Sequence, residues 1–375
     1  MRIGIEAQRI FRTNKHGMDI YTVQLIKHLQ LIDTENTYFV FIRKDTDICI
    51  EETDNFTLVV FDSLFYVDWE QLLLPLKVKS YQLDFLMCTS NTAPLFCPVP
   101  ILITLHDVIF LDKYYTGGTY YQRFGNTYRK WVLPKVIHRA KKVFTVSKFE
   151  ANLILKHFKK NQKIVVIYNG IAPHFKSSKR KKSKVTFMGK KDFPKKYLLF
   201  IGNKAPKKNM DRVIEAYIIY SKTKTDPCDL VILDTERNQV LRFLKKRNAI
   251  SIIQKIHCVG YVKNEFLPEI YANAKLFLYP SLRESFGLPL LESMASGTPV
   301  ITSNTASLSE IGGNAAAYVN PKNSRMLSNK IIELENNEAL LKKMTVLGYK
   351  RAEMFSWYDT AKQILQNFNE ILEKK

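Results

Sequence analysis

The chain has 375 residues, 46% of them hydrophobic and 12% aromatic, which suffices for packed globular domains and excludes a chain that is disordered throughout. Lysine and arginine outnumber aspartate and glutamate by 57 to 35, a formal net charge of +22. This charge predicts either an anionic partner, such as nucleic acid, phospholipid headgroups or a phosphorylated small molecule, or simply a basic surface.

Two further features bear on location. No apolar run reaches the roughly 18 residues that a membrane span needs, and the opening residues do not resemble a signal peptide. The five cysteines are scattered and form no C-x-x-C pair, so we expect reduced thiols in the cytoplasm rather than disulfides or a zinc site.

In the first half of the chain, short apolar runs alternate with longer amphipathic segments. Strands are predicted at 2–7, 37–43, 56–61, 83–88, 101–105, 142–146 and 164–168. Helices are predicted between several of them, at 18–31, 66–80, 119–140 and 148–158. A strand-then-helix alternation favours a parallel sheet covered by helices on both faces.

The alternation stops at 176–196, a lysine-rich stretch that we interpret as a linker or exposed loop. It resumes with strands predicted at 197–202, 229–233, 256–259, 275–279, 299–302 and 315–319. Helices are predicted at 209–222, 236–248, 265–273, 289–296, 324–335, 338–353 and 358–373. The pattern indicates two doubly wound α/β domains in tandem, with ligands at the carboxyl ends of strands and in the cleft between the domains.

Two loops of the first domain could carry chemistry. Gly17, before an amphipathic helix, permits a ligand to approach backbone N–H groups, although it could equally just shape the loop. No G-x-G-x-x-G accompanies it, which argues against an ordinary dinucleotide site. His106 follows the strand 101–105, where a histidine could bind a polar substrate, handle a proton, or be merely structural.

In the second domain, "FIGNKAPKKN" joins a strand to a helix through a basic loop. Lys204, Lys207 and Lys208 could neutralise a diphosphate that also meets the helix N-terminus. A solvated basic loop is the alternative, and the segment is not the phosphate loop of ATPases.

The segment "RESFGLPLLESM" at 283–294 holds two glutamates on either side of a glycine and a proline. Pro289 suits a first helical turn, so the preceding residues form a lead-in loop whose backbone N–H groups attract anions and hydroxyls. We therefore place Glu284 at a strand end before the turn and Glu292 inside the first turn of the helix.

A D-x-D sequence at Asp45 and Asp47 could in principle hold a divalent cation. It lies in an early, charged loop, and no His/Cys cluster or G-x-S-x-G accompanies it. We therefore expect no metal site and no metal cofactor.

Together these pieces resemble the retaining, nucleotide-sugar-dependent glycosyltransferases of family four. The match is strongest in "PSLRESFGLPLLESMASGTPVITSN", which is similar to the E-x7-E region of that family, and it extends to "VGYVKNEFLPEIYANAKLFLYPS" and "IGNKAPKKN". In the first half, "HGMDIYT", "LHDVIF" and "VIYNGIAPHF" occur at corresponding places. An arginine is common in the family where Lys207 stands, and many relatives carry a basic or small residue where Asp19 stands.

The resemblance implies the GT-B fold: two facing, doubly wound Rossmann-like domains. It places an acceptor-binding domain at 1–175, the basic linker at 176–196, a nucleotide-sugar domain at 197–355 and a C-terminal helix at 356–375 that crosses back to the N-terminal domain. It implies catalytic roles for His106, Glu284 and Lys208. The donor-binding residues that it implies are Gly17, Asn203, Lys204, Lys208, Tyr261, Val262, Glu284, Ser285, Phe286, Gly287, Leu288 and Glu292.

In this interpretation Lys208 neutralises the donor diphosphate, Glu292 accepts hydrogen bonds from the ribose, and Glu284 holds the sugar and phosphate. The resemblance implies metal-independent transfer of a hexose from GDP-mannose or a UDP-sugar to a glycan or lipid-linked acceptor in polysaccharide or lipopolysaccharide synthesis. The basic-aromatic stretch 114–135 and the linker 176–196 suggest docking on the anionic cytoplasmic face of the inner membrane. Alternatives are an epimerase of the same fold, transfer to a soluble sugar and, from charge alone, a nucleic-acid-binding protein, although no nucleic-acid module is present.

Overall fold

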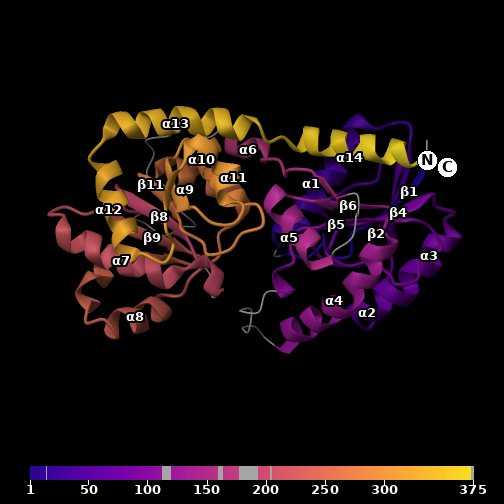
Figure 1. Ribbon diagram of the computed structural model, residues 1–375, viewed down its shortest axis with the longest axis horizontal. Helices are drawn as coiled ribbons and strands as arrows, with labels where there is room; N and C mark the ends of the chain where they lie inside the picture. The colour runs from indigo at the N-terminus through magenta and orange to yellow at the C-terminus, as the bar shows by residue number, and fades with distance from the viewer. Residues whose placement is uncertain (14, 112–119, 159–163, 177–192, 203–204, 373–375) are drawn as a thin grey trace. The chain divides into compact units, whose positions relative to one another are not determined.

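The computed structural model describes residues 1–13, 15–111, 120–158, 164–176, 193–202 and 205–372. The chain divides into two compact units (Figure 1). Unit 1 comprises Met1–Gly170 and Ser356–Lys375, and unit 2 comprises Ile171–Phe355. Of the predicted basic linker 176–196, residues 177–192 lie outside the described residues.

Unit 1 is built on a seven-stranded parallel sheet with the strand order β3-β2-β1-β4-β5-β6-β7. Its strands are short apolar runs, most of them buried on both faces as in a parallel sheet covered by helices. They are β1 (Arg2–Glu6), β2 (Thr37–Ile42), β3 (Phe56–Val60), β4 (Phe85–Cys88), β5 (Ile101–Leu105), β6 (Lys142–Thr145) and β7 (Ile164–Val166).

The helices of unit 1 cover this sheet. They are α1 (Gly17–Ile32), α2 (Tyr66–Asp68), α3 (Leu74–Ser80), α4 (Tyr120–Arg139), α5 (Lys148–Phe158) and α14 (Trp357–Leu372). The helix predicted at 66–80 is present over those residues, but a π-helical turn at Trp69–Leu73 lies between α2 and α3. Pro75, near the start of α3, has no N–H to donate to the preceding turn, so the regular ladder is interrupted there.

The last helix, α14, packs on α1 in unit 1 (Figure 1). The rings of Phe368 and Phe85 lie 5.0 Å apart, and Lys142 Nζ donates to Glu370 Oε2 at 2.6 Å. A Cβ on Gly170 would lie 2.0 Å from the backbone nitrogen of Trp357. Glycine is therefore required where the end of the first segment meets the start of α14.

Unit 2 contains a six-stranded parallel sheet with the order β10-β9-β8-β11-β12-β13. Its strands are β8 (Tyr197–Ile201), β9 (Asp229–Leu233), β10 (Ile256–Val259), β11 (Leu276–Tyr279), β12 (Val300–Ser303) and β13 (Ala317–Val319). Its helices are α6 (Pro173–Lys176), α7 (Met210–Thr223), α8 (Arg237–Lys245), α9 (Leu267–Asn273), α10 (Leu288–Ala295), α11 (Leu308–Gly312), α12 (Ser324–Glu335) and α13 (Glu338–Glu353).

Both sheets reverse their winding direction beside their first strand. The reversal falls between β1 and β4 in unit 1 and between β8 and β11 in unit 2. In doubly wound sheets a ligand crevice opens at this point, beyond the carboxyl ends of the strands. The prediction of two doubly wound α/β domains is thereby confirmed, and the two switch points direct attention to the loops after β1, β4, β8 and β11.

Within the part of the chain that the structure describes, no helix combines the length and the apolar character needed to cross a bilayer.

Candidate active site

The switch point of unit 2 brings together two predicted site residues that are 76 positions apart. Lys208 closes a 3-10 turn after β8, and Glu284 lies in the loop after β11. Lys208 Nζ donates to Glu284 Oε1 at 2.8 Å, with side chains only 15% and 9% exposed. Burial acts to raise the pKa of Glu284, but the charges of Lys208 and Lys207 outweigh it and hold the pKa below its usual range. Glu284 is therefore a carboxylate at neutral pH.

Side-chain hydroxyls hold the loop after β11 in place. Ser307 Oγ donates to the carbonyl oxygens of Glu284 and Phe286, at 3.0 and 3.1 Å. Thr302 Oγ1 donates to the carbonyl of Tyr279 at 2.9 Å. Because these bonds fix the backbone on both sides of Glu284, its carboxylate is positioned before any ligand binds.

The loop leads into the start of α10. Gly287 has φ +107°, a backbone conformation that favours glycine, and a Cβ there would also require the end of the Leu308 side chain, 2.8 Å away, to move. Pro289 lies in the first turn of α10, as predicted. Ser285 and Phe286 precede Gly287, and the helix begins at Leu288. Pro289 has no N–H and Leu290 N–H donates to the carbonyl of Gly287 at 3.0 Å, so within the first turn the N–H of Leu288 is the one that the helix itself cannot satisfy.

Glu292 lies in the second turn of α10, so its placement in the first turn was wrong. Its side chain is buried, and Tyr271 OH donates to Glu292 Oε2 at 3.1 Å. Burial raises the pKa of Glu292 to about 7, against the opposing effects of the Tyr271 hydrogen bond and the Lys208 charge. The two glutamates at this helix start therefore differ in charge state: Glu284 is ionised, whereas Glu292 titrates near neutrality.

The other predicted donor residues of unit 2 fall into two groups. Asn203 and Lys204 lie outside the described residues. Tyr261 and Val262 follow β10 at the same carboxyl edge of the sheet, Tyr261 exposed and Val262 buried. Gly260 accepts a hydrogen bond from the backbone of Asp234 at 3.1 Å, which ties the Tyr261 segment to the loop after β9.

Asn209, which was not predicted as a site residue, holds two loops of this site together. Asn209 adopts a left-handed conformation with φ 64°, which asparagine tolerates better than most residues. Its buried amide donates to the carbonyls of Pro280 and Pro321 at 2.8 and 2.7 Å. It thereby ties the loop after β8, which carries Lys208, to the loop after β11, which carries Glu284. An asparagine at the first position of the helix predicted at 209–222 was the available signal.

In unit 1, His106 follows β5 and is buried. Its Nε2 lies 2.9 Å from the carbonyl oxygen of Thr89, and its backbone N–H donates to Asn91 Oδ1 at 2.6 Å. Burial lowers the pKa of His106, so the imidazole is neutral at pH 7. Because a carbonyl can only accept, Nε2 carries the proton and Nδ1 keeps a lone pair for a hydroxyl donor.

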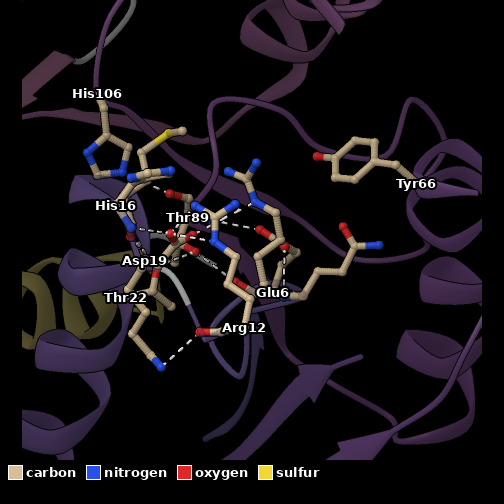
Figure 2. A network of polar contacts seen from close by, with 12 residues as sticks. Glu6, Arg12, His16, Asp19, Thr22, Tyr66, Thr89 and His106 are labelled. Carbon is tan, nitrogen blue, oxygen red and sulfur yellow. Dashed lines mark hydrogen bonds and ion pairs between the residues drawn. The ribbon is translucent and has the colours of Figure 1, made fainter. Parts of the chain in front are cut away.

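The start of α1 lies near the switch point of unit 1 (Figure 2). A Cβ on Gly17 would meet nothing within 4 Å, so open space adjoins this backbone. Asp19 is buried and accepts hydrogen bonds from Arg12 Nε at 2.9 Å and from the backbone N–H of His16 at 2.7 Å. The residue that departs from the family pattern therefore caps α1 and holds an arginine of the preceding loop.

The D-x-D aspartates after β2 are engaged by protein groups. Asp47 pairs with Lys15 at 2.5 Å, and Asp45 accepts from the backbone N–H of Thr46 at 2.8 Å. Among the described residues, no group of three or more His, Cys, Asp or Glu side chains could hold a metal ion.

Comparison with known families and structures identifies the class. The model "Glycosyltransferase Family 4" matches residues 17–175, and "Glycosyl transferases group 1" matches residues 181–351. A crystal structure of a glycosyltransferase from Rickettsia africae shares the fold, with a TM-score of 0.74 and 19% identity over 100% of this chain and 99% of that one. The family models define a glycosyltransferase, and the two doubly wound sheets and the structural match define its fold as GT-B.

Two curated relatives are also similar. O-antigen chain mannosyltransferase B of Escherichia coli is 32% identical over 46% of this chain and 45% of its own length. O-antigen chain mannosyltransferase RfbU of Salmonella typhimurium is 28% identical over 72% of this chain and 70% of its own length. This chain belongs to glycosyltransferase family four.

Proposed function

We propose that this chain is a retaining glycosyltransferase that moves a hexose to a glycan or lipid-linked acceptor during synthesis of a cell-surface polysaccharide such as lipopolysaccharide. The buried Lys208–Glu284 pair at the start of α10 carries the proposal, because it places a cation and a carboxylate at the switch point of unit 2. The names of the relatives favour mannose as the transferred sugar, and we propose GDP-mannose as its donor. A UDP-sugar is the second donor class.

The chemistry follows from where charge develops. Breaking the sugar–phosphate bond builds positive charge on the ring and negative charge on the nucleoside diphosphate. Lys208 and the start of α10 would stabilise the leaving diphosphate. Glu284, already ionised, would accept hydrogen bonds from sugar hydroxyls, and Glu292 from the ribose. Neutral His106 would accept one from the transferred sugar through Nδ1.

No step in this scheme needs a metal ion or another cofactor, because Lys208 and the helix start supply the positive charge at the diphosphate. For retention of configuration, we propose front-face attack by the acceptor hydroxyl, assisted by the leaving phosphate. Turnover is therefore expected to persist in excess EDTA, and loss of activity restored by a divalent cation would contradict metal independence.

The donor assignment is testable by thermal shift and calorimetry with GDP, UDP and their sugars. Glu292→Ala should weaken nucleotide binding, whereas Glu284→Ala should mainly reduce turnover. Glu333→Ala is a matched control, because Glu333 is an exposed glutamate of unit 2 that pairs only with Lys330 in the described structure. If both site variants bound and turned over the donor like the Glu333 variant, the site assignment would be wrong.

The reaction class is decided by product analysis. A transferase releases nucleoside diphosphate in proportion to the acceptor supplied, and its product keeps the anomeric configuration of the donor. Conversion of the donor sugar to its epimer without an acceptor would support the epimerase instead. Transfer to a free monosaccharide but to no glycan or lipid-linked acceptor would support an enzyme of soluble sugars.

We also propose that α4 docks on the anionic cytoplasmic face of a membrane, which would place the enzyme in the cytoplasm as a peripheral protein. Trp131 is 58% exposed on this helix, and Lys135 Nζ lies 3.6 Å from its ring centroid. Residues 112–119 of the predicted basic-aromatic stretch lie outside the described residues. A basic helix with exposed aromatic side chains suits the bilayer interface.

Trp131 is also a built-in reporter, because the other two tryptophans, Trp69 and Trp357, are buried. Vesicles of phosphatidylglycerol should shift its fluorescence to the blue at low salt, and Trp131→Phe should abolish the shift. Phosphatidylcholine vesicles serve as the neutral control. An unchanged spectrum with phosphatidylglycerol would exclude docking through α4.

A further inference from the structure

Unit 1 contains a cavity of about 1080 Å³. The proposed binding of the donor nucleotide to unit 2 leaves this cavity without a ligand. Its walls come from the loop after β1, the start of α1, the loop after β2, the α2 region and α4. A volume of this size lies at the upper end of the range for small-molecule sites, which is about 300 to 1,000 Å³.

One part of the wall is cationic. The charged residues of the lining are four arginines and two aspartates: Arg9, Arg12, Arg43, Arg129, Asp45 and Asp68. Arg12 Nε donates to Asp19 Oδ2 at 2.9 Å (Figure 2). Arg9 Nε lies 3.9 Å from Oδ1 of the same carboxylate. Buried Glu6 also acts on Arg9, but burial raises the pKa of this carboxyl group. The four arginines of the lining still outnumber its two aspartates and Asp19 together, so the cavity keeps an excess positive charge.

The same wall holds polar atoms without partners. Gln8 is only 4% exposed and lines the cavity, yet its Oε1 has no hydrogen-bond partner. The buried Nε of Arg9 also lacks one. Buried polar groups normally find a partner, and an unpaired one is costly. Gln8 Oε1 can only accept a hydrogen bond, whereas Arg9 Nε can only donate one. A ligand that completes the site would therefore bring a hydroxyl donor to Gln8 and an acceptor oxygen to Arg9.

The part of the wall that comes from the α2 region and α4 is apolar. Leu64 and Phe65 are 84% and 71% exposed, and Leu72 and Phe124 are also exposed. Single exposed apolar side chains are common, but several lining one cavity mark a binding surface. Phe124 lies on α4, the helix proposed to meet the membrane.

The floor between these parts is rigid. Glu70 is buried, and Tyr66 OH and Thr92 Oγ1 donate to it at 2.8 and 3.0 Å. Tyr128 OH donates to the same carboxylate. Because Tyr66, Thr92 and Tyr128 all line the cavity, this network holds walls from α2, the loop after β4 and α4 at fixed positions.

We propose that this cavity binds the acceptor, and that the acceptor is an anionic amphiphile in which a phosphate or diphosphate joins a hydroxyl-bearing sugar to an isoprenoid-like chain. The inference rests on the proposed function and names its acceptor class. Arg9 would donate to the phosphate oxygens, Gln8 Oε1 would accept from a sugar hydroxyl, and Asp19 would position Arg9 and Arg12. Leu64, Phe65, Leu72 and Phe124 would contact the chain. A neutral glycan would leave the guanidinium charge unmatched, and a free phosphate would leave the apolar wall in water.

Calorimetry on the full chain separates these ligands without any nucleotide. The probes are farnesyl diphosphate, farnesol and inorganic pyrophosphate, each below its aggregation concentration. Farnesyl diphosphate should bind more than about tenfold tighter than either part alone, since both walls then contribute. Equal affinity for pyrophosphate and farnesyl diphosphate would reduce the cavity to a free-anion site, and absence of farnesyl diphosphate binding would overturn the proposal.

Paired variants locate the binding. Arg9→Gln should weaken farnesyl diphosphate binding by about tenfold or more through loss of a charged hydrogen bond. Phe65→Ser should weaken it by about tenfold through loss of apolar contact. Arg139→Gln and Leu31→Ser are the matched controls, because both residues are exposed in unit 1 outside the cavity lining. Thermal melting and nucleotide affinity, measured on each variant, show that the fold and unit 2 are intact.

The acceptor inference and the proposed function fail in different ways. If nucleotide binds to unit 2 while the cavity variants bind farnesyl diphosphate as the controls do, the acceptor assignment is wrong and the transferase proposal stands. If farnesyl diphosphate binds as described but no nucleotide sugar binds or reacts, the cavity is confirmed as an amphiphile site and its role as an acceptor site is overturned.

Discussion

At the scale of single residues, the two glutamates around the start of α10 differ because their surroundings differ. Glu284 faces Lys208 and remains ionised, whereas Glu292 has a phenol as its hydrogen-bonding partner and a pKa of about 7. The sequence predicted that Gly287 and Pro289 separate the two residues. It could not predict the difference in pKa, because Lys208 and Tyr271 come from other elements and only the folded sheet brings them close.

The raised pKa of Glu292 predicts a pH dependence of stability. The carboxyl group ionises near pH 4.5 when unfolded and near pH 7 when folded, so the unfolded chain loses its proton first as the pH rises. The free energy of unfolding contributed by this group therefore falls between about pH 4.5 and 7 and is level above, a loss of about 3 kcal/mol.

Urea denaturation of the wild type and of Glu292→Gln at several pH values measures this effect. The amide does not titrate, so the difference in unfolding free energy between the two proteins should shift in favour of the variant from pH 5 to pH 7. Glu333→Gln, at an exposed site, controls for the other titrating groups. A difference between wild type and Glu292→Gln that stays constant over this range would contradict the raised pKa.

At the scale of elements, strand positions were predictable because each strand is a short apolar run bounded by polar or turn residues. The π-helical turn after α2 was not predicted, since it changes the hydrogen-bond pattern beside Pro75 without changing the apolar pattern of the amphipathic run. Asn209 was missed for a different reason: its two carbonyl acceptors, on Pro280 and Pro321, lie 71 and 112 positions away. Short-range pattern carries no information about such contacts.

The junction between the loop after β11 and α10 should be intolerant of a side chain at Gly287. Gly287→Ala forces alanine into a left-handed conformation against Leu308, and we expect a loss of about 2 kcal/mol in unfolding free energy. Because the same junction presents the N–H groups of the helix start, nucleotide affinity should fall as well. Chemical denaturation and calorimetry measure the two effects.

Gly17→Ala is the informative counterpart at the start of α1. A Cβ there meets nothing within 4 Å, so stability should be unchanged while turnover falls if substrate approaches this backbone. Unchanged turnover would show that Gly17 merely shapes the loop. A Gly287→Ala protein as stable as wild type, with unchanged nucleotide affinity, would remove the structural basis assigned to that junction.

At the scale of the whole molecule, the units can be perturbed separately. Phe368 of α14 is fully buried against Phe85 in unit 1. Phe368→Ala should destabilise unit 1 by about 3 to 5 kcal/mol while nucleotide binding to unit 2 persists. All three tryptophans belong to unit 1, so tryptophan fluorescence during denaturation follows that unit alone.

Phe243→Ala provides the reciprocal control, since Phe243 lies in the core of unit 2. The variant should leave unchanged the denaturant concentration at which tryptophan fluorescence reports unfolding of unit 1. It should lower the denaturant concentration at which unit 2, the unit that nucleotide stabilises, unfolds. If Phe368→Ala left the tryptophan transition unchanged, α14 would not be an integral part of unit 1.

The return of α14 also has a consequence for synthesis on the ribosome. Unit 2 is inserted between two segments of unit 1. Its first and last residues are joined by a hydrogen bond from Ile171 N–H to the carbonyl of Phe355 at 3.2 Å. Unit 2 can therefore fold as soon as residue 355 has emerged. Unit 1, although begun first, exposes the surface of α1 that α14 covers until residues 357–372 are translated, so the domain that starts the chain is the last to be completed.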